Sequence, residues 1–281
     1  MPAWDLDTLS PMADEALREL ERRHHAAPDL ENETAWLRER YRSGQVSAER
    51  LWLAAYVGHS AAIEVYYGKE AYQDWLPRSP KQVEYWIQGL EQWGQIVVTR
   101  AGVAVARAMN PSQPEFLAAL GAAERWTLDP IGENASAANS ARARAGERTL
   151  NAFDWIEAGR EPEPTDPDAL TFCMGSLAAA AAGSASSCAG RHGAWLCSWP
   201  GGEKSDEEFK SRRPSEAVAS GIARAARLWS LDATVRAVQE ELSTWALGHS
   251  DPIASRVDNQ ATAERSPQAP IALDGGPRRE S

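Results

Sequence analysis

Two cysteines and a histidine in the second half of the chain are the side chains best suited to bind a metal ion. Cys188, His192 and Cys197 offer thiolate and imidazole groups, which zinc prefers as ligands. Their spacing matches no known zinc finger, and a fourth ligand would require Cys173 to fold back onto them. We therefore expect ordinary buried thiols here, and we predict that the protein holds no metal and no cofactor.

The sequence motifs that usually mark an enzyme do not occur. We find no Gly-x-Ser-x-Gly nucleophile elbow and no His-Glu-x-x-His zinc-binding helix. The Gly68-Lys69 pair does not make a phosphate-binding loop, because Glu70 follows where such a loop needs Ser or Thr. We name no catalytic residue, and this absence favours a non-enzymatic protein.

Three residues are candidates for contact with a partner. Trp195 and Trp199 lie in a stretch with two glycines and a proline, and an exposed Trp pair in a loop would suit an interaction hot spot. The alternative for this pair is packing as a lid over neighbouring helices. His59 is expected at an exposed turn between two helices, where it contacts a partner or hydrogen-bonds the neighbouring loop.

Charge and composition narrow the class of partner and the compartment. The 281 residues carry a formal net charge of −11, whereas a nucleic-acid binder needs a basic face. The acidic balance suits another protein with a basic surface. The three cysteines do not indicate a secreted disulfide framework, and the acidic N-terminus resembles no signal peptide. We therefore expect a cytoplasmic protein.

One uncharged stretch, residues 169–190, is long enough to cross a bilayer. It consists mostly of Ala, Gly and Ser, and these small residues contribute little free energy of membrane insertion. We expect a helix that is buried against other helices, and no membrane contact.

The elements that must position these residues are all helical. The clearest begins at Ser79 and Pro80, which read as a hydroxyl N-cap and a proline in the first turn, and ends before Pro111. Apolar residues recur between them at steps of three and four. They are Val83, Trp86, Leu90, Trp93, Val97, Ala101, Ala104 and Ala108. The pattern predicts one long central helix over about residues 80–109, in an all-α multi-helix bundle or short α-solenoid.

The composition changes near residue 250. Residues 1–250 contain enough apolar side chains for a single helical domain, and the alternative is an N-terminal unit over 1–128 with an Ala-rich unit over 129–250. Residues 251–281 are rich in Pro, Gly, Arg, Asp and Ser, with little to bury. We expect them to form a disordered tail.

The segment from Leu51 to Val65 resembles the inner part of an ankyrin repeat. Its Leu-Trp-Leu-Ala-Ala-Tyr-Val-Gly-His run is similar to the Leu-x-Leu-Ala-Ala-x-x-Gly-His core of that family. Ala54 and Ala55 would let two short helices approach closely, and Gly58 would make the turn. No second copy follows at the period of an ankyrin array. We therefore expect a helical hairpin within a larger bundle.

The sequence also resembles a group of uncharacterised, alanine-rich helical bacterial proteins, some of which are described as immunity proteins of toxin systems. The resemblance rests on several short segments of the N-terminal half. They are Leu17, Leu20, Trp36–Arg38, Tyr41, Leu51–His59 and Ala119–Pro130. It implies a non-enzymatic helical protein that binds another protein. The alternative is an enzyme or small-ligand carrier with a site between bundle helices.

Overall fold

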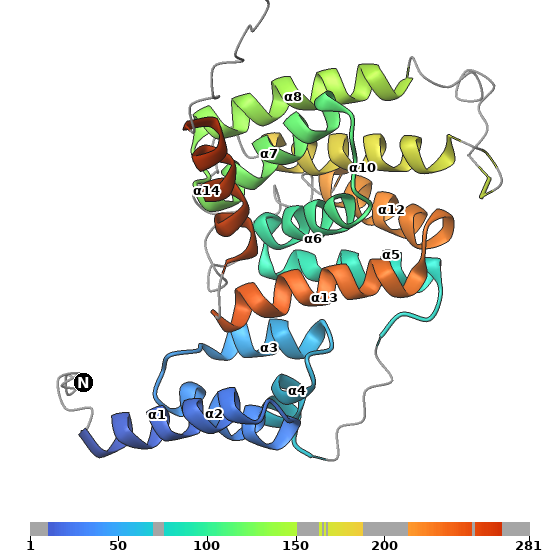
Figure 1. Cartoon of the computed structure of the whole chain (residues 1–281). Helices are drawn as coiled ribbons and strands as arrows, with labels where there is room; N and C mark the ends of the chain where they lie inside the picture. The colour runs from blue at the N-terminus through green and yellow to red at the C-terminus, as the bar shows by residue number, and fades with distance from the viewer. Residues whose placement is uncertain are drawn as a thin grey trace, which may run out of the picture.

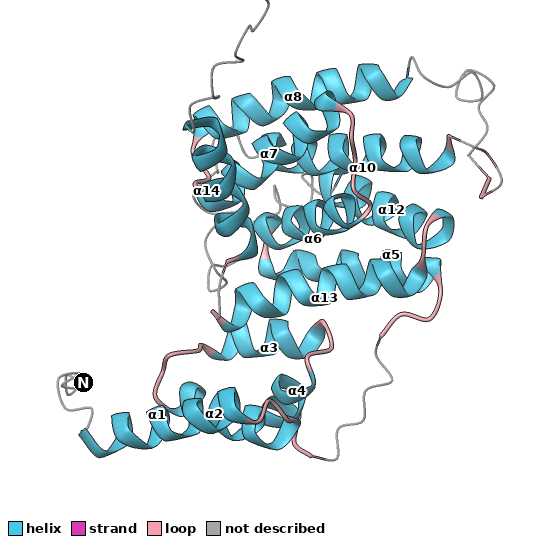
Figure 2. Ribbon diagram, viewed as in Figure 1, coloured by secondary structure: helices cyan, strands magenta, loops and turns pink. Residues whose placement is uncertain are grey.

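The computed structural model describes residues 11–69, 76–150, 163–164, 166, 168–187, 213–248 and 251–265. All regular elements of this described part are helical, as Figure 2 shows, so the predicted all-α class is confirmed. The α-helices are α1 (Pro11–Ala26), α2 (Leu30–Arg42), α3 (Ala48–Tyr56), α4 (Ser60–Tyr67), α5 (Pro80–Gly89), α6 (Gln95–Ala108), α7 (Pro114–Leu128), α8 (Gly132–Leu150), α10 (Ala169–Ser186), α12 (Arg213–Leu228), α13 (Leu231–Leu247) and α14 (Pro252–Arg265). A short 3-10 helix, η1 (Leu90–Trp93), separates α5 from α6.

The helices are stacked from the N-terminal end of the bundle to the opposite end (Figure 1). Helices α1, α2 and α4 lie at one end, and α8 lies at the other, packed on α7 and α10. Helix α13 comes late in the sequence yet contacts both α3 and α6. It therefore connects the first four helices to the rest of the bundle. One contiguous hydrophobic core runs through these layers, from Leu37 to Ile253.

The predicted long helix over residues 80–109 is divided into two. Its start is as expected, because Ser79 caps α5 by accepting a hydrogen bond from the amide of Gln82 at 3.3 Å. The division falls at Gly94, whose φ of 95° is a left-handed value that favours glycine. The apolar pattern continues across the break because both α5 and α6 turn their apolar side chains to the core. Periodicity alone therefore gave no sign of the interruption.

The hairpin expected from the ankyrin-like segment is formed by α3 and α4. Ala54, Ala55, Ala61 and Ala62 are almost completely buried, which lets the two helices pack closely. Gly58 makes the turn with a φ of 94°. Helix α2 contacts α4, and α13 contacts α3, so each helix of the hairpin packs against a further helix.

The expectation of disorder from residue 251 onward is wrong for residues 252–265, which form α14. The side chain of Ile253 is completely buried, and Val257 packs partly buried against the core. Asp251 and Arg256 form ion pairs with helices far away in the sequence. Composition could not reveal these partners. Residues 266–281 lie outside the described residues.

The uncharged stretch forms α10, which is held by close contacts with small residues. Among the described residues, α10 is the one helix long and apolar enough to cross a membrane by length and composition, and half of that apolar window is buried inside the protein. It packs against α8, α7, α12 and α6. Such packing is typical of a core helix, as its Ala, Gly and Ser composition predicted.

The closest approach in this layer gives a test of the packing. A Cβ atom at Gly175 would lie 2.5 Å from Phe116 Cζ and would also collide with Thr149 Oγ1. At Gly146 in α8, a Cβ would meet nothing within 4 Å. We expect Gly175→Ala to lower the free energy of unfolding by about 2 kcal/mol through overpacking. The control Gly146→Ala should raise it by about 0.5–1 kcal/mol, since Ala is the better helix former. Urea unfolding measures both, and equal effects would contradict the packing.

Candidate functional site

Aromatic side chains from α3, α4 and η1 form a continuous row, which we call the aromatic row. Trp52 and Tyr56 lie four residues apart on α3 and so share one face of that helix. Their ring centroids lie 4.6 Å and 5.0 Å from that of Trp93 on η1. On the other side, the ring of Trp52 stacks on Tyr66 at 6.5 Å, and Tyr66 meets Tyr67 edge-on at 4.8 Å. The row thus runs from Tyr67 to Tyr56.

Reciprocal hydrogen bonds attach the end of the row to α5. The hydroxyl of Tyr56 donates to the carbonyl oxygen of Trp86 at 2.8 Å, and the indole nitrogen of Trp86 donates to the carbonyl oxygen of Tyr56 at 3.3 Å. Burial raises the pKa of Tyr56 to about 12, so its hydroxyl stays protonated and remains a donor at neutral pH. Gly89 is required beside this contact, because a Cβ there would collide with Tyr56 Oη.

An open groove lies where the row reaches α5, and we call it the α5 groove. It has a volume of about 470 Å³. Its lining residues are Tyr56, Leu76, Pro77, Arg78, Gln82, Tyr85 and Trp86. Tyr85 is 60% exposed, and the ammonium of Lys81 lies 6.0 Å from its ring. At the far end of the aromatic row, Tyr66 and Tyr67 are 41% and 39% exposed. The aromatic row therefore has exposed tyrosines near both of its ends.

His59 stands at the turn between α3 and α4, where the sequence placed it, but its side chain is only 18% exposed and does not lie at an exposed site as expected. Its Nδ1 accepts a hydrogen bond from the amide of Ala62 at 3.3 Å, which makes it the N-cap of α4. Its Nε2 lies 3.3 Å from Glu33 Oε1 on α2. Both ring nitrogens thus have partners within the fold. This arrangement matches the structural alternative for His59, while its contact with a partner remains a prediction.

The other candidate residues from the sequence lie outside the described residues. These are Trp195 and Trp199 for partner binding, and Cys188, His192 and Cys197 for a metal. Within the described ranges, no group of three or more His, Cys, Asp or Glu side chains is arranged to hold a metal ion. Cys173 is buried in α10, and burial raises the pKa of its thiol to about 12. That thiol is therefore protonated and unreactive at neutral pH.

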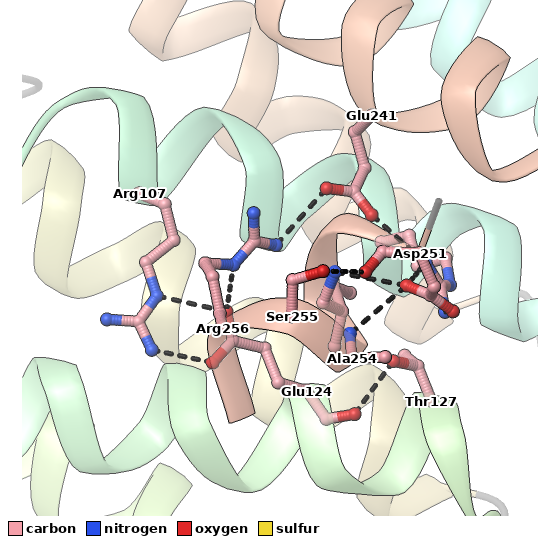
Figure 3. Close-up of polar contacts among 10 residues, drawn as sticks. Arg107, Glu124, Thr127, Glu241, Asp251, Ala254, Ser255 and Arg256 are labelled. Carbon is pink, nitrogen blue, oxygen red and sulfur yellow. Dashed lines mark hydrogen bonds and ion pairs between the residues drawn. The ribbon is translucent and has the colours of Figure 1, made fainter. Parts of the chain in front are cut away.

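A second polar arrangement, which we call the ion network, joins four helices in the bundle (Figure 3). Its members are Arg100 and Arg107 of α6, Glu124 of α7, Glu241 of α13, and Asp251 and Arg256 at the start of α14. Arg107 makes a two-pronged contact with Glu124, at 3.1 Å and 2.6 Å. Arg256 lies between two acids and donates to Glu124 at 2.9 Å and to Glu241 at 3.1 Å.

Arg100 is the most deeply buried cation of the ion network. It donates to Glu241 at 3.0 Å and to both carboxylate oxygens of Asp251, at 2.9 Å and 2.6 Å. Its guanidinium carbon also lies 4.5 Å from the ring centroid of Trp245. The exposed fractions of the Arg100 and Glu241 side chains are 1% and 4%, and Glu124 is completely buried. Such burial is tolerated because every charge faces an opposite one.

Burial and pairing act in opposite directions on the acids of this network. Burial raises the pKa of Glu241 above its ordinary value, against the opposing charges of Arg256 and Arg100. Burial also acts to raise the pKa of Asp251, but hydrogen bonds and charge from Arg100, with the amides of Ala254 and Ile253, hold it below its ordinary value. Each of the three carboxylates accepts hydrogen bonds from an arginine. This arrangement favours a structural role, in which the network holds helices together, over a role in proton transfer.

No sequence motif marks the residues of the ion network, but their positions on the apolar stripes of their helices do indicate buried charges. Arg100 lies three residues after Val97 and four before Ala104, so it falls on the apolar stripe of its helix. Glu124 follows Leu120 by four residues, and Glu241 follows Val238 by three. Charges of both signs on the apolar faces of separate helices indicate buried ion pairs.

The low pKa of Asp251 predicts a pH-dependent contribution to stability. Because its pKa is below 3.8 in the fold, the ionised carboxylate stabilises the protein above that pH, and this contribution is lost as the pH falls through the lower value. We expect Asp251→Asn to lower the free energy of unfolding at pH 7 by about 2 kcal/mol. The difference from the wild type should shrink as the pH falls below about 4. Urea unfolding across pH measures this, and a constant difference would contradict it.

No protein-family model matches the sequence, and no significantly similar curated protein or solved structure was found. The function is therefore inferred from the side chains of this chain and their arrangement.

Proposed function

We propose that the chain is a non-enzymatic helical protein that binds another protein in the bacterial cytoplasm, in the manner of an immunity protein. The observation that carries the proposal is the aromatic row, which ends in exposed tyrosines and at the α5 groove. Tyr and Trp dominate the residues that contribute most to binding at protein interfaces.

The packing around the exposed tyrosines favours tight contact. Tyr85 lies on α5 between the Ser79 cap and Trp86, whose hydrogen bonds with Tyr56 hold the helix against α3. Tyr66 is stacked on Trp52, which in turn packs on Trp93. Side chains that are already ordered lose little conformational entropy when a partner binds. The overall charge of −11 would add electrostatic attraction toward a basic partner.

The alternative function, an enzyme or small-ligand carrier, would need polar groups that face one another between bundle helices. The interior does contain such groups, including Arg100, Glu124 and Glu241. Each of them is already bonded to another member of the ion network. A substrate or ligand would have to break these pairs, so the observation favours the binding protein over this alternative.

Removing the exposed ring of the α5 groove tests the proposal. We expect Tyr85→Ala to weaken binding of a stoichiometric partner roughly tenfold to a hundredfold, as for a central interface tyrosine. Tyr41, which is 41% exposed on α2, provides the control Tyr41→Ala with little expected effect. A native pull-down with the tagged full chain at low and high salt, followed by titration of the captured partner, measures both. Equal retention by the two variants, or a folded chain with no stoichiometric partner, would refute the proposal.

Two substitutions at His59 separate its structural role from partner contact. His59→Ala removes the N-cap of α4 and should lower the free energy of unfolding by about 1 kcal/mol. Asn is itself a good N-cap, so His59→Asn should be closer to the wild type in stability. We expect the Asn variant to retain the partner in the same pull-down. Loss of the partner in a His59→Asn chain of normal stability would instead make this histidine a contact residue.

A further inference from the structure

Charged side chains form part of the attachment of helix α14 to the bundle. It contacts α7 and α13 along one side of the stack (Figure 1). Among its side chains with described burial, only Ile253 is fully buried, and Val257 adds a partly buried contact. Asp251 and Arg256 add hydrogen-bonded ion pairs to α6, α7 and α13. The face that receives α14 is formed by α6, α7 and α13, and we call it the α14 groove.

The acids and bases of the ion network are equal in number both within the groove and within α14. Without α14, the groove still contains two neutral pairs, Arg100 with Glu241 and Arg107 with Glu124. Helix α14 contributes one acid, Asp251, and one base, Arg256. Breaking a buried ion pair is costly when it leaves a charge without a partner. Departure of α14 leaves no such charge in the groove, so the groove side of the network does not oppose its departure.

Asp251 couples the formation of α14 to its docking. Its Oδ1 accepts hydrogen bonds from the amides of Ile253 and Ala254, at 3.0 Å and 3.2 Å, and so caps the start of the helix. The same carboxylate accepts the two guanidinium hydrogen bonds of Arg100. Figure 3 shows Asp251 and Arg256 on either side of the first turn of α14. A segment that places an acid, an aliphatic residue two positions later and an arginine five positions later is therefore what the groove recognises.

We propose that the α14 groove is a helix-docking site, that α14 occupies it reversibly, and that a partner protein inserts a helix with the same acid–aliphatic–arginine pattern in its place. This site is separate from the aromatic row and the α5 groove, so it does not depend on the function proposed for them. The charge complementarity of Arg100 for an acid, and of Glu124 and Glu241 for an arginine, identifies the partner helix by its chemistry. While α14 is docked, it competes with that helix.

The first test uses the full chain with Asp251→Asn and Arg256→Gln, which weakens the resident helix and leaves every groove residue unchanged. The probe is a fluorescent peptide with the natural sequence of residues 249–265. We expect saturable binding to this variant by fluorescence anisotropy, weakened about tenfold or more at high salt. The wild-type chain should bind far less, because its own α14 competes at a high effective concentration. A control peptide with the same two substitutions should not bind.

Two outcomes of that titration would overturn the proposal. One is a folded variant that binds no peptide, and the other is equal binding of the natural and substituted peptides. Sedimentation of the wild-type chain tests a further outcome. Concentration-dependent dimerisation would identify α14 of a second copy as the occupant of the groove, and it would overturn the proposal that a different protein supplies the helix.

Hydrogen exchange on the wild-type chain gives a test that does not require the variant to fold. We expect the backbone amides of α14 to exchange faster than those of α6 and α13, and to exchange faster still at high salt. Exchange of α14 at the rate of α6, without any salt dependence, would show that α14 opens only when the whole protein unfolds. That result would overturn reversible docking.

Discussion

The positive charge of Arg100 is the constraint on which the arrangement of the later helices depends. It sits on α6 in the interior, where an unpaired cation would be strongly destabilising. Glu241 of α13 and Asp251 at the start of α14 supply the opposite charges that Arg100 needs. The ring of Trp245 also packs against the guanidinium group. The hydrogen bonds of the ion network are directional, so they favour one rotation of each helix about its own axis. Apolar packing alone specifies this rotation less sharply. The interior is thus held in register by charge as well as by shape.

The helices pack through small side chains in one part of the stack and through large aromatic side chains in another. Around α10, alanines and glycines bring helix backbones together, and Gly175 receives the ring of Phe116 where a side chain would not fit. Around α3 and η1, large rings such as Trp52 and Trp93 fill wider spaces. Alanine and glycine offer a partner little side-chain surface to contact. The aromatic row, in contrast, extends from buried rings to the exposed rings of Tyr66 and Tyr67. The candidate binding surface therefore lies where these rings reach the surface, on α3, α4 and α5.

The sequence predicted the features that depend on nearby residues. Ser79 was recognisable as a helix start, and the Gly58 turn followed from local chemistry alone. Gly94 was missed because the apolar stripe continues on both sides of it. Helix α14 was missed because Asp251 meets Arg100 across 151 residues of sequence, and such a partner cannot be read from composition. The paired acids and bases on apolar stripes were visible, but which acid meets which base required the fold.

The position of α13 between α3 and α6 has a consequence for the nascent chain. Residues 231–247 leave the ribosome after the helices on both sides of them have been made. Until then α3 and α6 expose the apolar faces that α13 covers, and Arg100 has neither Glu241 nor Asp251 as its counter-ion. Contacts between residues far apart in the sequence slow folding, and the intermediates that form before them expose apolar surface and are prone to aggregate. Until α13 has been made, the helices that precede it are held by their own local contacts.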